Sequence, residues 1–320
     1  MLLLTVVIAC AFVVGMSISK GSTCAVTAAK ELVFERHGTM LIGFVIAASV
    51  AGLVTHPLNW VSSSTYHLAA DVPISLALVA GAVLIGIGAV INDACLLGTL
   101  ARIGQGEVRF LALPVGLAFG FAIADRQSLL AAGMSFGDAD AVSPLPGWLV
   151  VVMSGALLIA AWLYQGQRGR LHPTPRIWPR GVMVVMGLCG AVLFALEPHW
   201  TYSDAVHAAV DRGGMDARTD ARALVISLAL VAGSVLSGIL ARVFVLQKPS
   251  FAQIGRSVAG GAVMALGGTL IPGGNDSLLL AAIPSGTLSG LTAYAIMSLT
   301  VPAVLWITRT RQRAAPLSAR

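Results

Sequence analysis

The chain has 320 residues, of which 57% are hydrophobic and only 11% are charged. With a mean hydropathy of +0.87, this composition excludes a soluble globular protein and indicates an integral membrane protein. The net charge of +6 does not indicate a nucleic-acid partner, because the basic residues are spread between apolar runs instead of gathering on a soluble domain. The lipid bilayer is therefore the expected environment.

Apolar runs long enough to cross a bilayer recur along the chain, since a transmembrane helix needs roughly 20 such residues. The nine candidate spans are 2–19, 39–56, 73–91, 108–124, 148–165, 181–196, 223–246, 257–272 and 287–308. The first has no basic residue before its apolar run, so we expect a retained helix and not a signal peptide. The predicted fold is an all-α integral membrane protein of about nine transmembrane helices.

Basic residues divide unequally between the loops on the two sides of the expected membrane. If the N-terminus lies outside, sixteen of the 20 Lys and Arg residues fall on the inner side. The four on the outer side are Arg126, Arg212, Arg218 and Arg222. Because Lys-rich and Arg-rich loops stay in the cytoplasm, the sequence predicts an outer N-terminus and a cytoplasmic C-terminus.

The chain contains an internal repeat with an offset of 180 residues. The segment GAVLIGIGAVINDACLLGTLARIGQGEVRFLA (81–112) aligns without a gap on GAVMALGGTLIPGGNDSLLLAAIPSGTLSGLT (261–292), and ten of the 32 positions are identical. In each copy an apolar helix stops at a polar tetrapeptide, Asn92-Asp93-Ala94-Cys95 or Gly273-Gly274-Asn275-Asp276, and a short apolar helix follows. Broken membrane helices of this kind are typical of transporters.

The predicted topology gives the two copies opposite orientations in the membrane. We therefore expect two inverted halves, residues 1–147 and 148–320, within one membrane domain. Non-helical backbone at bilayer depth must be buried in protein or line a cavity, because lipid cannot hydrogen-bond to it. The tetrapeptides therefore predict short re-entrant helices and polar loops at the midplane of a transport pathway.

Two other features carry expectations. The segment Ser19-Lys20-Gly21-Ser22-Thr23-Cys24 separates the first span from a short helix that begins at Ala25. Aromatic side chains of the types that favour the headgroup layer occur in the expected outer loops at Trp60, Tyr66, Trp200 and Tyr202.

These motifs resemble the YeeE/YedE sulfur-transport family, whose members include bacterial thiosulfate uptake proteins. The resemblance covers most of the chain and is carried by GMSISKGSTCAVTAAKEL (15–32), GAVLIGIGAVINDACLLGTLARIGQGE (81–107) and GGAVMALGGTLIPGGND (260–276). In the third block the family often has Gly-Gly-Cys, and here Asn275 stands in place of that cysteine. The resemblance implies uptake of a small sulfur-containing anion, with thiosulfate as the first candidate.

The resemblance also implies central cysteines that contact the anion in passage. Cys95 and Cys24 match such positions. The predicted substrate pathway comprises Cys95, Cys24, Asn275, Asn92, Gly273 and Gly274.

Thiosulfate has a soft terminal sulfur and a hard sulfonate end, so a selective pathway should offer thiols to one and N–H donors to the other. Cys95 at a helix start can help to supply both. We expect neutral thiols that act as weak donors, because thiolates would repel a dianion. The alternatives are that Cys95 and Cys24 pack as small apolar residues and that Asn275 belongs to a structural turn.

Three charged residues are further candidates. Asp93 and Asp276 are carboxylates at expected membrane depth, where ionisable groups are functional candidates. They could carry protons that drive uptake, and the alternative role is capping of the local turns. Arg102 could meet the sulfonate, or it could snorkel to the interface and set the topology.

Neither a metal nor a cofactor is expected, since the six histidines form no ligand spacing and no Walker or dinucleotide motif occurs in a fitting context. An enzyme is not the first expectation. The expected partners are a small inorganic sulfur anion, the lipid bilayer and a cytoplasmic sulfur-carrier or rhodanese-like protein, with no nucleic acid. Two alternatives stay open: a membrane thiol or persulfide oxidoreductase using Cys24 and Cys95, and a non-transporting membrane subunit derived from a transporter.

Overall fold

The computed structural model describes residues 2–36, 38–126, 144–171, 180–210, 217–271 and 273–314. Arg212, one of the expected outer arginines, and the chain beyond residue 314 lie outside the described residues. Within the described ranges the chain is helical, and its extended segments make one isolated bridge, between Glu107 and Gln247.

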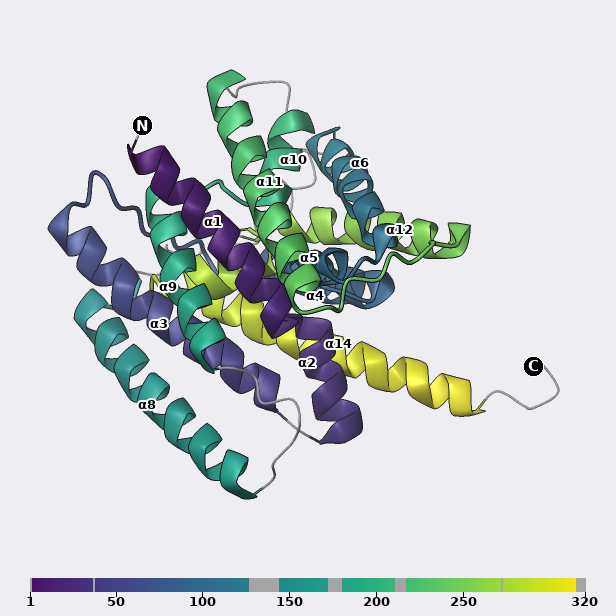
Figure 1. Cartoon of the computed structure of the whole chain (residues 1–320), viewed down its shortest axis with the longest axis horizontal. Helices are drawn as coiled ribbons and strands as arrows, with labels where there is room; N and C mark the ends of the chain where they lie inside the picture. The colour runs from purple at the N-terminus through teal and green to yellow at the C-terminus, as the bar shows by residue number, and fades with distance from the viewer. Residues whose placement is uncertain are drawn as a thin grey trace.

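Long helices form the body of the protein (Figure 1). They are α1 (Leu2–Gly21), α3 (Thr39–Val61), α4 (Leu76–Asn92), α6 (Leu113–Arg126), α8 (Gly147–Leu171), α9 (Arg180–Leu196), α11 (Ala217–Leu240), α12 (Phe251–Gly268) and α14 (Leu288–Ala314). Short helices lie between them: α2 (Ala25–Lys30), η1 (Glu31–Glu35), α5 (Leu96–Gly104), η2 (Val108–Ala112), α10 (Tyr202–Val210), α13 (Asn275–Ser277) and η3 (Leu278–Ala282).

The expected nine spans all contain a helix, but only seven helical segments of the described chain are long and apolar enough to cross a membrane. The two others are α9, which has 17 residues, and α12, whose first turns carry Gln253 and Arg256. The span expected at 223–246 is too long, because α11 ends at Leu240 and non-helical chain follows to α12. The protein is a multi-pass membrane protein.

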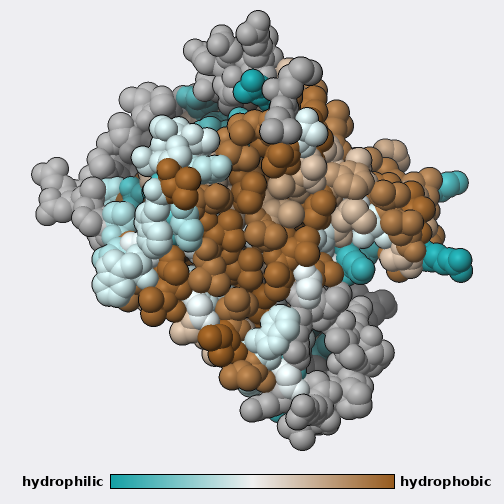
Figure 2. Space-filling model, turned by 60° about the vertical axis from the view of Figure 1, so that its left-hand side comes forward, coloured by the Kyte–Doolittle hydropathy of each residue, from teal (hydrophilic) through white to brown (hydrophobic). Residues whose placement is uncertain are grey.

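The surface is apolar over a broad face, as Figure 2 shows. The helix α8 exposes several large apolar side chains that point away from the rest of the protein. Trp148, Val152, Ile159 and Leu163 are each 60% or more exposed. Exposure of large apolar side chains on this scale is stable only against lipid or another protein.

Helices separated by the 180-residue offset make corresponding contacts. The offset relates α1 to α9, α3 to α11, α4 to α12 and α6 to α14. Accordingly α1 packs on α11 while α9 packs on α3, and α6 packs on α12 while α14 packs on α4. The helix α8 has no counterpart under this offset.

The helices α4 and α12 cross in antiparallel directions through glycines. A Cβ on Gly81 would come within 2.8 Å of the Gly267 carbonyl oxygen, and one on Gly88 would come within 2.8 Å of that of Gly260. Because the residue number rises along one helix as it falls along the other, the two copies of the repeat point in opposite directions at this contact.

The backbone of the two breaks also corresponds. Asp93 has φ 67° and its counterpart Gly273 has φ 93°, while Gly106 has φ 90° and its counterpart Gly286 has φ 76°. Each copy therefore turns twice through the left-handed region, once before its short helix and once after it.

A further part of the repeat escaped the sequence analysis. The offset places Cys24-Ala25-Val26-Thr27-Ala28-Ala29 on Asp204-Ala205-Val206-His207-Ala208-Ala209, so that α10 corresponds to α2. The expectation that Trp200 and Tyr202 lie in the headgroup layer is wrong. They are 1% and 8% exposed, because they pack inside the protein, where Trp200 meets the ring of Phe194 edge-on at 5.2 Å.

Candidate functional site

Cys95 begins α5, directly after the break that ends α4. Asp93 turns the chain in the left-handed conformation, and Cys95 is extended at the N-cap. Its Sγ accepts hydrogen bonds from the N–H groups of Gly98 at 3.4 Å and Ala25 at 3.2 Å. Because Ala25 is the first residue of α2, the sulfur lies at the N-termini of two helices, where N–H dipoles favour an electron-rich atom.

Cys24 precedes α2 and faces Cys95. The two sulfur atoms lie 3.9 Å apart, the residues are 3% and 0% exposed, and both thiols are free. The helix α5 approaches this pair at Gly98, where a Cβ would overlap the Cys24 sulfur. The absence of a side chain at position 98 therefore permits the two thiols to lie together.

Asn275 brings a third helix start to the same place. It is the first residue of α13 and is 2% exposed, and its Oδ1 accepts a hydrogen bond from the N–H of Leu96 at 3.2 Å. Gly273 and Gly274 form the turn before it. The Tyr202 hydroxyl donates to the Leu96 carbonyl at 3.0 Å, which ties α10 to the start of α5.

Asn92 braces the first break from inside the protein. It is fully buried, and its Nδ2 donates to the Ala94 carbonyl at 2.8 Å and to Thr99 Oγ1 at 3.1 Å. Its Oδ1 is buried and has no hydrogen-bond partner among the described residues. Asn92 therefore fixes the loop that presents Cys95.

Two cavities lie at opposite ends of α5. The larger, of about 470 Å³, reaches Leu96 at the start of the helix, and the smaller, of about 410 Å³, reaches Gln105 just after its end. Lining residues of the two correspond under the 180-residue offset: His67 with Gln247, His199 with Ser19, and Ser285 with Gln105. Neither Cys24 nor Cys95 lines either cavity, but Cys95 directly precedes Leu96, and Cys24 lies two residues after Ser22, which lines the smaller cavity.

Asp276 is a buried carboxylate beside the larger cavity. It is 3% exposed, and its Oδ1 accepts the Ser277 N–H at 3.0 Å. Among the described residues no cation pairs with it. Its neighbours Gly274 and Ser277 line the cavity, as does Asp204, which is within electrostatic range of Asp276.

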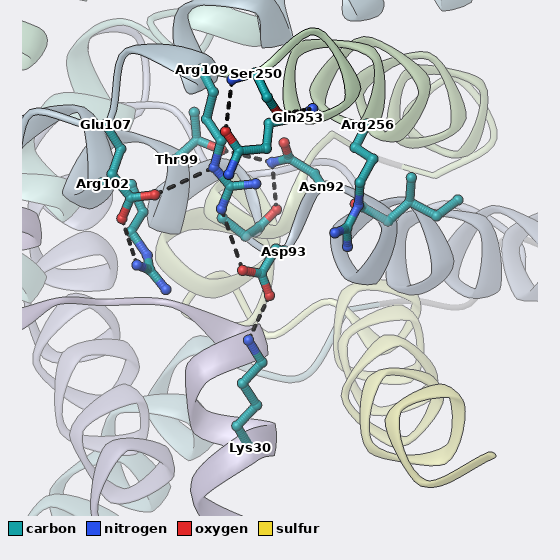
Figure 3. Close-up of polar contacts among 12 residues, drawn as sticks. Lys30, Asn92, Asp93, Thr99, Arg102, Glu107, Arg109, Ser250, Gln253 and Arg256 are labelled. Atoms are coloured by element: carbon teal, nitrogen blue, oxygen red, sulfur yellow. Dashed lines mark hydrogen bonds and ion pairs between the residues drawn. The ribbon is translucent and has the colours of Figure 1, made fainter. Parts of the chain in front are cut away.

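Asp93 and Arg102 belong to a charged cluster at the other side of the first break (Figure 3). The Asp93 carboxylate pairs with Lys30 at 2.5 Å and with Arg109 at 3.3 Å. Glu107 pairs with Arg102 at 2.6 Å and with Arg109 at 3.3 Å. Asp93 was expected as a carboxylate at membrane depth that carries protons or caps the turn, and the structure gives it two cationic partners.

The profile of the family described as Sulphur transport matches residues 20–303, which include both breaks. The chain belongs to the sulphur transport family. A search of curated proteins gives no match. Family membership and the apolar helices together assign this member of the family to membrane sulfur transport.

The predicted pathway residues converge in this family member. Cys24, Cys95 and Asn275 meet at the start of α5, and the other predicted residues, Asn92, Gly273 and Gly274, form the turns behind them. Arg102 contacts Glu107 and not the thiols. In the described part of the chain no three His, Cys, Asp or Glu side chains group in a way that would hold a metal ion.

Sequence reasoning missed four residues that shape this site. They are Lys30, Arg109, Asp204 and Tyr202. A signal for Asp204 was present, because the 180-residue offset aligns it with Cys24 inside a shared Ala-Val-x-Ala-Ala pattern. Lys30 and Arg109 gave no such signal, since their partner Asp93 is distant from both in the sequence.

Proposed function

We propose that the protein takes up thiosulfate through a pathway that passes the Cys24–Cys95 pair, with Asn275 completing the contact. The observation that carries the proposal is the meeting of three helix starts around two buried thiols, which adjoin a lining residue of each cavity in the sequence. An anion at this place would meet N–H dipoles from several directions, while the thiols offer soft contacts to its terminal sulfur.

The proposed pathway runs through two inverted halves. Nine helices cross the membrane in this proposal, with α9 and α12 completing the set because their counterparts α1 and α4 belong to candidate spans. The helices α1, α3, α4 and α6 make the first four crossings, α8 makes the fifth, and the other four helices follow. Because five crossings precede the second half, that half enters the membrane from the side opposite to the first. The antiparallel contact of α4 and α12 and the corresponding lining of the two cavities support this arrangement.

The proposed setting is a bacterial inner membrane with the N-terminus outside. The support is the excess of Lys and Arg in the loops assigned to the cytoplasm, at sixteen of 20. The cavity that reaches Leu96 then opens outward, and the cavity at Gln105 opens to the cytoplasm, where a sulfur-carrier or rhodanese-like protein would receive the product.

Uptake of a dianion against an inside-negative potential costs roughly 2.3 kcal/mol per charge per 100 mV, so the transporter needs an energy source. Asp276 is the stronger of the two proton-carrying candidates, because it is buried beside the outer cavity, whereas Asp93 is held by two cations. We expect uptake to rise with an inward proton gradient in wild type and to lose that response in Asp276→Asn. Uptake that ignores the gradient would remove proton coupling.

The proposal is tested by uptake of sulfur-labelled thiosulfate into proteoliposomes. Cys95→Ala removes the acceptor of two N–H groups and one soft contact, so we expect uptake to fall by roughly tenfold or more. Cys189→Ala is the matched control, since Cys189 lies in α9 and its thiol is beside that of Cys10. Unchanged uptake in Cys95→Ala would reject the thiol pathway.

A thiol or persulfide oxidoreductase is the second candidate function, favoured by the 3.9 Å separation of the Cys24 and Cys95 sulfur atoms. That function requires a reversible Cys24–Cys95 disulfide in turnover. Mass spectrometry that finds this disulfide in a protein without thiosulfate flux would select the oxidoreductase over the transporter.

A further inference from the structure

The end of α4 gathers an excess of positive charge. Three cations and two carboxylates are joined there by ion pairs, and a fourth cation, Arg256, hydrogen-bonds the nearby Ile91 carbonyl outside those pairs (Figure 3). The six residues are Lys30, Arg102, Arg109, Arg256, Asp93 and Glu107. We call these six residues the charged mouth. Two positive charges remain unmatched, which is the complement of a dianion such as thiosulfate or sulfate.

Within the charged mouth, the Asp93 carboxylate presents each of its oxygens to a different cation. Oδ1 accepts from Lys30 and Oδ2 from Arg109, and the Arg109 guanidinium is held over the Phe110 ring at 4.2 Å from its centre. A sulfonate or sulfate presents oxygens to cations in the same manner. The side chains of Asp93 and Lys30 are 30% and 35% exposed, so water and small ions can reach the pair.

The second copy of the repeat shows that this charge is not required by the backbone. The counterparts of the six residues under the 180-residue offset are uncharged: Val210, Ala282, Ser289, Leu76, Gly273 and Thr287. The second break nevertheless has the same succession of left-handed turns. The charged mouth therefore adds chemistry to one end of the pathway without being needed to shape the break.

We propose that the charged mouth is a second anion-binding site, in which Asp93 acts as a tethered counter-anion that the travelling dianion displaces from Lys30 and Arg109. The proposal rests on the proposed function for the identity of the cargo. Arg102, which lies within electrostatic range of both Asp93 and Cys24, would connect this site with the thiol pair. With Asp93 in place the mouth is closed, and an arriving anion opens it by exchange.

Sulfate is the probe for this site, because it has the charge and oxygens of thiosulfate but lacks the soft sulfur that the thiols would select. Binding of sodium sulfate to the purified full-length protein is measured by calorimetry at low ionic strength. Asp93→Asn removes the competing anion and tolerates the left-handed backbone, so sulfate should bind roughly tenfold more tightly. Lys30→Gln and Arg109→Gln should weaken binding by a similar factor.

Lys248→Gln is the matched control, since Lys248 is an exposed cation in the loop before α12 and outside the charged mouth. Lys30 is partly exposed, so Lys30→Gln keeps the test valid if Arg109→Gln fails to fold. Raising the salt concentration should reduce the differences, because these partly exposed charges are screened.

The outcomes separate this proposal from the proposed function. Sulfate binding that is absent, or equal in wild type, Asp93→Asn and Lys30→Gln, would overturn the second anion site, whatever the thiosulfate flux. Sulfate binding that follows the mouth charges in a protein without thiosulfate flux would support the site and reject the transport proposal. Tighter sulfate binding by Asp93→Asn, together with thiosulfate flux through the wild-type protein, supports both the second anion site and the transport proposal.

Discussion

The two copies of the broken helix share a backbone but differ in chemistry. In the first copy the break carries Cys95 and lies against Cys24, whereas the offset puts Asn275 and Asp204 at those positions in the second copy. The left-handed turns recur at corresponding positions, and the glycine contacts of α4 with α12 join the copies. The comparison teaches that turns and close helix packing define the scaffold, while a few side chains decide what each half can bind.

The largest loss of uptake is expected from a change that separates the Cys24 and Cys95 sulfur atoms, which only the first copy brings together. Gly98 admits the Cys24 sulfur in the first copy, while the corresponding residue of the second copy is the fully buried Leu278. Gly98→Ala should abolish thiosulfate uptake and lower the free energy of unfolding by about 1–3 kcal/mol, because its Cβ overlaps the sulfur. Uptake assays and thermal unfolding in detergent measure these effects.

Gly255→Ala is the control for that change, because Gly255 lies in α12 with open space where the Cβ would stand. It should retain uptake and stability. Full uptake in Gly98→Ala would show that the close approach of the two thiols has no part in transport.

A smaller effect is expected from changes at Asn275, the counterpart of Cys95 in the second copy. Asn275→Ala removes the acceptor of the Leu96 N–H and should cost about 1 kcal/mol of stability. Thiosulfate uptake should fall in the same variant. Asn275→Cys, which restores the family's cysteine, should recover more uptake than Asn275→Ala. Equal uptake in wild type, Asn275→Ala and Asn275→Cys would instead assign Asn275 to a structural turn.

The segments that precede α4 and α12 are each attached to the other copy of the repeat, but through different groups. In the first, Asp71 accepts hydrogen bonds from the N–H groups of Leu288 at 3.0 Å and Ser289 at 3.1 Å. In the second, Val245 and Gln247 donate backbone hydrogen bonds to the carbonyls of Gln105 and Gly106, each at 3.0 Å. Only the first of these two attachments uses a carboxylate.

The smallest predicted effect therefore comes from Asp71. Burial raises the pKa of Asp71, but hydrogen bonds from the Ser289 side chain and from neighbouring N–H groups outweigh burial and hold the pKa below its usual value of 3.8. The carboxylate therefore stabilises the fold above that pH, and this contribution is lost as the pH falls through the lowered pKa. Asp71→Asn should cost about 1 kcal/mol at neutral pH, as expected for loss of a helix cap.

Thermal unfolding at pH 7 and pH 3 measures this contribution. The difference between wild type and Asp71→Asn should shrink at the lower pH, because the carboxyl of the unfolded chain has the higher pKa and takes up a proton first. A difference that is the same at both values would show that the charge of Asp71 does not stabilise the attachment.

The sequence predicted the helical membrane fold, the two breaks and the residues that meet at them, because apolar length and polar interruptions are local signals. The sequence overestimated the length of α11. It also predicted that Trp200 and Tyr202 lie in the headgroup layer, because composition does not show that residues 202–210 fold back into the protein as α10. The pairing of Asp93 with Lys30 was not predictable either. That contact depends on how α2 packs beside the break, 63 residues earlier in the chain.

The most direct test of the thiol pathway measures protection of Cys24 and Cys95 from a small methanethiosulfonate reagent, in a Cys10→Ala, Cys189→Ala background. Mass spectrometry follows the labelling rate with thiosulfate or sulfate present. We predict that both thiols react through the larger cavity and that thiosulfate, but not sulfate, slows the reaction several-fold. Labelling that is insensitive to thiosulfate, in protein that transports it, would contradict passage of the anion along the thiol pair.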